Sequence, residues 1–224
     1  MVKVVKASQF DPTLIDCGPM KRNSTTGGKY LSLTYNSKDD VYIQSPRCRL
    51  PFGLSEHEGG SYKIQISLDN YKLAHKAETE FVKMVMDVDD RIKNLAVENS
   101  KDWFGKSMKM ELINELYHSQ VKISEDWPPT FSLKLPYSNN KFTTLFFDAD
   151  KNLLDSSHMQ NVIQRNTEVI AAFQLSSMWF VGSRFGAIWS CKQCQVFPKI
   201  VNEVDDNSFV ILDEDMDMDE NDDD

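Results

Sequence analysis

Aromatic and basic side chains gather around one predicted turn in the last quarter of the sequence. Flat aromatic rings stack on unpaired bases of any identity, and Lys and Arg side chains bind phosphates, so a groove for single-stranded nucleic acid needs both. The alternative is that the aromatic residues belong to the core and the charges are merely solvated. The residues concerned are Trp179, Phe180, Arg184, Phe185, Trp189 and Lys192.

Further candidates for the same chemistry lie on strands predicted elsewhere in the chain. Tyr30, Tyr42, Lys63 and Lys134 occupy the polar positions of segments in which apolar and polar residues alternate. In a strand such alternation places successive side chains on opposite faces. We therefore expect these four side chains to point away from the core.

No pattern in the sequence indicates catalysis. The four histidines are scattered without the spacing of a zinc protease, and no Gly-rich loop followed by Lys is present to hold phosphates. We predict a protein that is not an enzyme and that needs no cofactor. The histidines are His57, His75, His118 and His158.

Two other groups could suggest a metal, and we favour a structural interpretation for both. Cys191 and Cys194 form a single Cys-x-x-Cys pair, whereas zinc sites commonly use two such pairs. On a regular strand these two thiols would point to opposite faces, which predicts ordinary buried cysteines. The acids of Asp87–Asp90 lie on a predicted helix, where a solvated face is the simpler expectation.

The net charge of −9 comes from one end of the chain. Residues 213–224 contain nine acids and no base, which leaves 25 acids against 25 bases in residues 1–212. Residues 127–147 and 169–202 contain bases and no acid, so an anionic ligand is expected near them. The acids of the tail are Asp213, Glu214, Asp215, Asp217, Asp219, Glu220, Asp222, Asp223 and Asp224.

This tail is predicted to be disordered, because charge repulsion and the lack of apolar area leave nothing to offset chain entropy. It could serve only to keep the protein in solution. A second interpretation is that the flexible polyanion competes with nucleic acid for a cationic groove and is released when nucleic acid binds.

The elements that must position these residues follow from periodicity. Strands are predicted at 30–35, 41–45 and 62–68, then a helix at 73–95 and a shorter one at 108–117. Four more strands are predicted at 131–137, 142–147, 169–181 and 185–197, the last two as a long hairpin. Helices inserted between the third and fourth strands of a mainly β chain indicate an OB-fold-like β-barrel, with a β-sandwich as the alternative.

The domain organisation expected from this pattern is an irregular N-terminal arm (1–28), an OB-fold-like domain (29–202) and the acidic disordered tail (203–224). No run approaches the roughly 20 apolar residues of a membrane helix. The N-terminal residues do not resemble a secretory signal, so we expect a soluble, intracellular protein with reduced cysteines.

Several segments together resemble a known viral family. These are Gly60–Ile66, the long helix after it, Asn99–Lys106, Thr130–Lys134, Leu145–Asp148, Trp179–Gly186, the terminal hairpin and the acidic tail. They resemble the single-stranded DNA-binding protein of large nucleocytoplasmic DNA viruses of the phycodnavirus and mimivirus type. That protein is in turn similar to the single-stranded DNA-binding protein of short-tailed coliphages. The resemblance covers about residues 28–200 and the tail.

The resemblance implies sequence-independent binding of single-stranded DNA during viral replication, recombination or repair. It also implies a tail that competes for the DNA groove and contacts viral DNA polymerase, helicase or primase, with oligomers a further expectation. The compartment would be the virus factory in the host cytoplasm, or the nucleus.

The coliphage protein has a basic residue before the Tyr-Lys strand and an aromatic residue at its end. This chain has Gly59 and Gly60 at the first place, where Arg47 and Arg49 could substitute, and it ends in Asp224. The predicted DNA contacts are Tyr30, Tyr42, Arg47, Arg49, Lys63, Lys134, Trp179, Arg184, Phe185, Trp189 and Lys192. The alternative function is a virion component that binds partner proteins and no nucleic acid.

Overall fold

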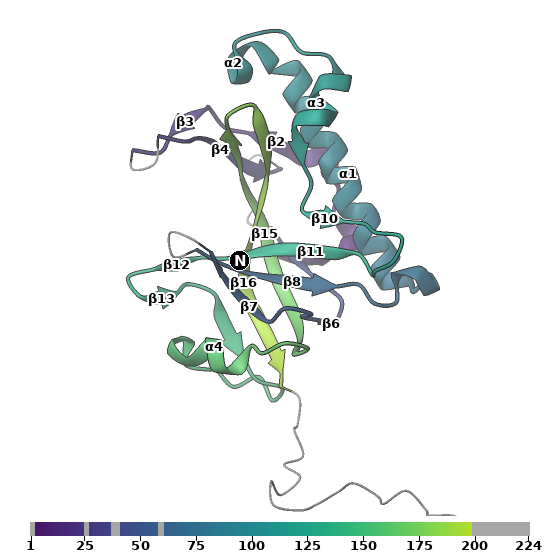
Figure 1. Cartoon of the computed structure of the whole chain (residues 1–224), viewed down its shortest axis with the longest axis vertical. Helices are drawn as coiled ribbons and strands as arrows, with labels where there is room; N and C mark the ends of the chain where they lie inside the picture. Colours follow the sequence, from purple (N-terminus) through teal and green to yellow (C-terminus); the bar gives the residue numbers. More distant parts are fainter. Residues whose placement is uncertain (1–2, 25–26, 37–40, 58–60, 199–224) are drawn as a thin grey trace, which may run out of the picture.

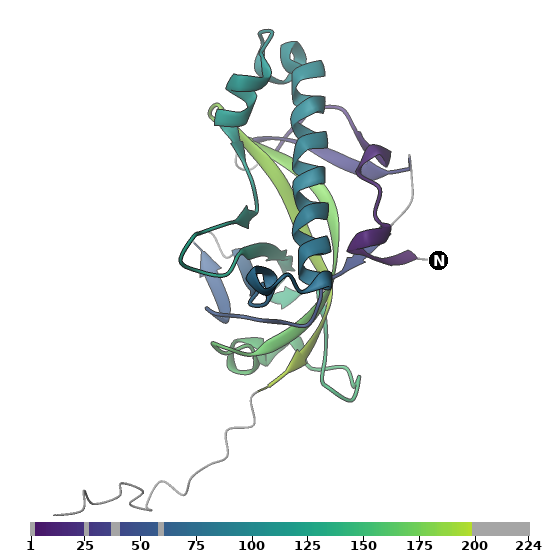
Figure 2. The same ribbon diagram turned by 90° about the vertical axis from the view of Figure 1, so that its right-hand side faces the viewer.

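A long β-hairpin runs through the whole molecule and organises it (Figures 1 and 2). The computed structural model describes residues 3–24, 27–36, 41–57 and 61–198. The hairpin consists of β15 (Glu168–Val181) and β16 (Arg184–Phe197), which pair antiparallel along their full length. Both strands were predicted within one residue of these limits. The predicted acidic tail lies outside the described residues.

The hairpin closes a small barrel. β15 pairs with β6 (Cys48–Arg49), β6 with β8 (Ser61–Ser67), β8 with β11 (Thr130–Leu135), and β11 with β16. Because β15 and β16 also pair with each other, this path returns to its start. The result is a mainly β, OB-like fold with inserted helices, as predicted from the sequence.

Further strands extend the same sheet from both sides of the hairpin. β15 also pairs with β4 and β5, and β16 with β9 and β14. The remaining strand limits are β4 (Lys29–Tyr35), β5 (Val41–Gln44), β7 (Leu54–His57), β9 (Tyr117–His118), β10 (Val121–Lys122), β12 (Tyr137–Ser138), β13 (Lys141–Phe142) and β14 (Leu145–Phe147).

The inserted helices cover one side of the molecule. Helix α1 (Lys76–Glu98) turns its apolar side chains, such as Phe81, Val85 and Ile92, into the core, where each is fully buried. The spacing of these residues by threes and fours is what predicts the helix. The other helices are α2 (Ser100–Phe104), α3 (Met110–Leu116) and the single turn α4 (Met159–Val162), with 3-10 turns at Ala7–Gln9, Pro12–Leu14, Tyr71–Leu73 and Ser156–His158.

Two segments that were expected to be irregular contain strands. In the expected N-terminal arm, β1 (Lys3–Lys6) pairs parallel with β5, while β2 (Ile15–Cys17) and β3 (Lys21–Arg22) pair with β4. The expected loop at 52–60 contains β7, which pairs with β8. These strands have two to four residues, too few to display a period, and they exist because longer strands offer them partners.

Cys191 and Cys194 share one face of β16, so the expectation of opposite faces is wrong. Cys191 pairs with Phe173 and Gln193 with Ala172, which leaves Lys192 as an extra residue in a β-bulge. The bulge adds one residue to the count and brings both thiols to the core, where each is fully buried. A hydrogen bond with Cys194, together with burial, holds the pKa of Cys191 well above its ordinary value.

Asp89 corrects a second expectation, because it lies in the interior and not on a solvated face of α1. Its side chain is 5% exposed and accepts hydrogen bonds from Tyr117 Oη and Ser119 Oγ, both at 2.5 Å. These two bonds tie the chain at β9 to the helix. Among the described residues, no cluster of His, Cys, Asp and Glu could hold a metal ion, and no helix has the length and apolar content to span a membrane.

Asp89 should make stability depend on pH. Burial raises the pKa of this carboxyl, against the opposing hydrogen bonds from Ser119 and Tyr117. The folded protein therefore binds the proton more tightly than the unfolded chain, and the contribution of Asp89 falls as pH rises through the raised pKa. Asp89→Asn does not titrate, so the stability of the natural chain relative to this variant should fall between about pH 4 and about pH 7. Urea denaturation at both pH values measures this difference, and parallel changes in the two proteins would contradict it.

Candidate nucleic-acid interface

A cavity of about 230 Å³ opens where β8, β11, β15 and β16 meet. Lys63 on β8 and Lys134 on β11 are directly opposite each other, and Lys134 is also in register with Ser190 on β16. Side chains at paired positions share a sheet face, so both ammonium groups project from the same surface. Within the described part of the chain, no carboxylate forms an ion pair with either lysine.

Trp179 forms the aromatic wall of this cavity. It is paired with Tyr30 on β4 and with Gly186 on β16, and Tyr30 is paired in turn with Lys21 on β3. Gly186 and Ser190 are four residues apart on one uninterrupted stretch of β16, so both rows of paired residues lie on one face. The two aromatic rings therefore occupy paired positions on β4 and β15, and the two lysines occupy paired positions on β8 and β11, all on the same face.

Gly186 makes room for the Trp179 ring. A Cβ atom at this position would lie 3.1 Å from two indole carbons and 2.6 Å from the His118 backbone oxygen. The His118 ring lies beside the indole, with its centroid 6.1 Å from that of Trp179. A side chain at 186 would displace one of these neighbours, so glycine allows the indole to lie across the strand.

The segment between β9 and β10 forms one rim of the cavity through Gln120. Asp89 fixes this rim, because Tyr117 and Ser119 on either side of His118 both donate hydrogen bonds to its carboxylate. Ser119 Oγ also accepts a hydrogen bond from the Val121 backbone N–H. The helix thus determines where His118 and Gln120 stand relative to Trp179.

Five of the predicted contacts share this face. Lys63, Lys134 and Trp179 line the cavity, Tyr30 lies beside Trp179, and Arg184 is exposed at the hairpin turn, two residues before Gly186. Tyr30, Lys63 and Lys134 were selected by their polar positions in alternating strands, and Trp179 and Arg184 by their places around the hairpin turn.

Four predicted contacts lie elsewhere. Tyr42 lies on β5 beside β1, and Lys192 is the half-buried bulge residue of β16. Arg47 forms an ion pair with Glu168 and lies 3.9 Å from the centroid of the Phe197 ring. Arg49 binds both carboxylate oxygens of Asp69, at 2.8 and 2.9 Å. The two arginines are therefore engaged by acids outside the cavity.

Phe185 and Trp189 were expected to contact DNA, but both belong to the core. Phe185 is 0% exposed and stacks on Phe180, and Trp189 is 1% exposed and packs against Phe131 and Phe173. On β16 they fall on the phase opposite to Gly186 and Ser190. They cannot stack on a base in this structure.

Sequence reasoning missed Lys21, His118 and Gln120. Lys21 was placed in the expected irregular arm, and the other two follow a short helix with no strand pattern around them. Their place on the interface depends on pairings between distant segments, which no local signal reveals.

Three comparisons with known proteins place the chain among its relatives, and one of them bears on the architecture. A family model described as "Family of unknown function (DUF5871)" matches residues 63–212. The crystal structure of gp2.5, a single-stranded DNA-binding protein encoded by bacteriophage T7, superposes with a TM-score of 0.50 at 11% identity, covering 76% of this chain and 98% of that one. The single-stranded DNA-binding protein from bacteriophage Enc34 gives 0.47 at 12% identity, covering 85% and 96%. No curated protein matches the sequence. The T7 comparison establishes likeness of fold.

Gly186→Ala should disturb the interface and destabilise the fold. The added methyl group meets a backbone oxygen at 2.6 Å, and overpacking of this kind costs about 1–3 kcal/mol. Gly18→Ala is the matched control, because a Cβ there would stand at an ordinary 3.6 Å from its nearest neighbour. Urea denaturation of the two variants tests the difference, and equal stabilities would argue against the close approach of the His118 backbone and the Trp179 ring to position 186.

Proposed function

The chain belongs to the DUF5871 family, whose function is unknown, and we propose that it binds single-stranded DNA without sequence preference. The observation that carries this proposal is the convergence of Lys63 and Lys134 with Trp179 and Tyr30 on one sheet face. Unpaired bases expose flat faces at the same intervals as backbone phosphates. A surface with rings and ammonium groups at neighbouring positions suits both.

Each side chain has a distinct role in the proposed complex. The half-buried Trp179 ring offers a stacking platform, because Gly186 leaves room for the indole across β16 and the His118 ring lies beside it. Lys63 and Lys134 bind phosphates on one side of the platform, and Lys21 and Arg184 extend the positive charge toward the hairpin turn. None of these contacts reads a base edge, which supports binding that is independent of sequence.

The likeness of fold to the T7 protein supports the same proposal, since that protein is a single-stranded DNA-binding protein. We propose a role in viral DNA replication, recombination or repair, with no catalytic activity. Viral DNA polymerase, helicase or primase are the proposed partners of the acidic tail.

Substitutions at the interface should weaken binding through two separable effects. Trp179→Ala removes a stacking surface worth about 1–3 kcal/mol, so the Kd for oligo-dT should rise roughly 5- to 150-fold. Lys63→Glu with Lys134→Glu should weaken binding and also reduce the slope of log K against log salt by about 1.4, since two phosphate contacts are lost.

Fluorescence titration with oligo-dT across a salt series measures both effects. The control is Lys76→Glu with Lys83→Glu, which makes the same charge change on exposed positions of α1, away from the cavity. If this control weakened binding as much as the interface pair, the effect would be one of net charge. If the natural chain did not bind at low salt, and also failed to bind without its tail, the proposal would be wrong.

We propose further that the acidic tail competes with DNA for the same groove. Removing residues 213–224 should then strengthen DNA binding at low salt, and the gain should shrink at high salt, where charges are screened. A chain of natural length with the nine acids replaced by Asn and Gln is the matched control, and it should behave like the deletion. Unchanged affinity in both variants would leave the tail with a role in solubility only.

A further inference from the structure

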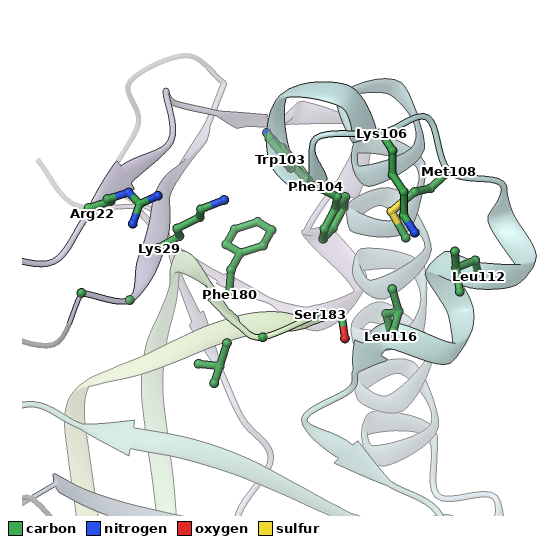
Figure 3. A pocket seen from close by; sticks show the side chains of 14 residues that line it. Arg22, Lys29, Trp103, Phe104, Lys106, Met108, Leu112, Leu116, Phe180 and Ser183 are labelled. Atoms are coloured by element: carbon green, nitrogen blue, oxygen red, sulfur yellow. The ribbon is translucent and has the colours of Figure 1, made fainter.

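A second cavity, of about 730 Å³, lies between the tip of the long hairpin, the β3–β4 hairpin and helices α2 and α3 (Figure 3). Its apolar wall includes Phe104, Met108 and Leu112 from the helical side and Phe180 from β15. Figure 3 shows Arg22 and Lys29 on the opposite side, with their charged ends directed across the opening toward the helices. The Lys106 side chain runs beside Met108 on the helical side.

The charge around this cavity has one sign. Arg22, Lys29 and Lys106 line it, and no acidic residue does. In the described ranges, no carboxylate forms an ion pair with any of these three cations. An occupant must therefore supply apolar side chains for the wall and negative charge for the rim.

The cavity and the proposed DNA interface lie on opposite faces of one sheet. Arg22 is paired with Lys29, and Lys29 with Phe180. The next pairs along the same strands are Lys21 with Tyr30 and Tyr30 with Trp179. Because side chains alternate along a strand, the first set faces the cavity and the second faces the DNA interface. Occupation of the cavity therefore does not block the DNA surface.

We propose that this cavity binds residues 213–219 of the same chain. In this segment Met216 and Met218 alternate with acids, so an extended backbone presents thioethers on one side and carboxylates on the other. Methionine side chains adapt to irregular apolar surfaces such as this wall. The carboxylates complement Arg22, Lys29 and Lys106.

The length of the chain permits this contact. The cavity includes Ser183, and β16 leads away from it through 14 residues to Phe197, a path of about 45 Å. Asp213 is 16 residues beyond Phe197 and can extend about 53 Å, which exceeds this path. The acidic-methionine segment therefore has both the reach and the chemistry.

The docking gives the tail a place to bind while DNA occupies the interface. That consequence rests on the proposed DNA binding, but the docking itself does not. Its test is accordingly made without DNA, where the tail can occupy either the DNA groove or this cavity and crosslinks to both are expected.

The experiment is photo-crosslinking in the full chain. With Met218 replaced by benzoylphenylalanine, irradiation should join position 218 to the cavity wall, and peptide mapping should find the products on residues 104–116 or 180–183 of the same molecule. Lys106→Glu should lower their yield about fivefold, because an attraction becomes a repulsion. Lys109→Glu is the matched control, since Lys109 is an exposed lysine three residues away that does not line the cavity.

A second probe position guards against non-specific capture. The same photoreactive residue at Val201 lies four residues after Phe197 and cannot reach the cavity, so it should give no such product. Products mapped only to β8 and β11, products formed only between two molecules, or equal yields with Lys106→Glu and Lys109→Glu would each overturn the proposal. Failure of oligo-dT binding, by contrast, would leave it intact.

Discussion

The antiparallel pairing of β15 with β16 is the interaction on which the rest of the structure depends. Both strands have 14 residues, and each carries different neighbours at its two ends. β15 pairs with β4 near the hairpin turn and with β5 and β6 at the far end, and β16 pairs with β9 and then with β11 and β14. One continuous ladder thus sets the register of the barrel and of the part covered by the helices. An error of one residue in this ladder would exchange core and surface side chains on both.

The bulges in the hairpin show how the register is adjusted locally. The shift at Lys192 brings two cysteines to the core, and the shift between Leu175 and Ser177 changes which positions of β15 face outward. Without the second shift, Trp179 would fall on the same phase as Leu175, in the interior. Each bulge leaves one residue without a backbone pair. The shift between Leu175 and Ser177 places the Trp179 ring at the surface of the strand.

Much of the fold followed from the sequence, because long strands and helices carry a period over many residues. The alternation in β8 and β11 located Lys63 and Lys134 correctly on the outer face, and these two residues needed no tertiary information. Phe185 and Trp189 were misjudged because composition cannot separate a core aromatic from an exposed one within the same hairpin. Their phase is fixed by partners such as Phe131 and Phe173, which come from other strands. The place of Lys21 on the interface could not be predicted for the same reason, because β3 forms through its pairing with β4.

A single sheet layer near the hairpin turn therefore separates two surfaces of different chemistry. One face carries a pair of aromatic rings and a pair of lysines at neighbouring positions, which suits a ligand that is itself a chain of rings and charges. The other face joins an apolar wall to a cationic rim, which suits a compact segment containing both apolar and acidic residues. Because Lys29 and Tyr30 are neighbours in sequence but face opposite ways, the two surfaces share a backbone and not side chains. A ligand on one face therefore makes no direct contact with a ligand on the other, and both can be bound to the same strands at once.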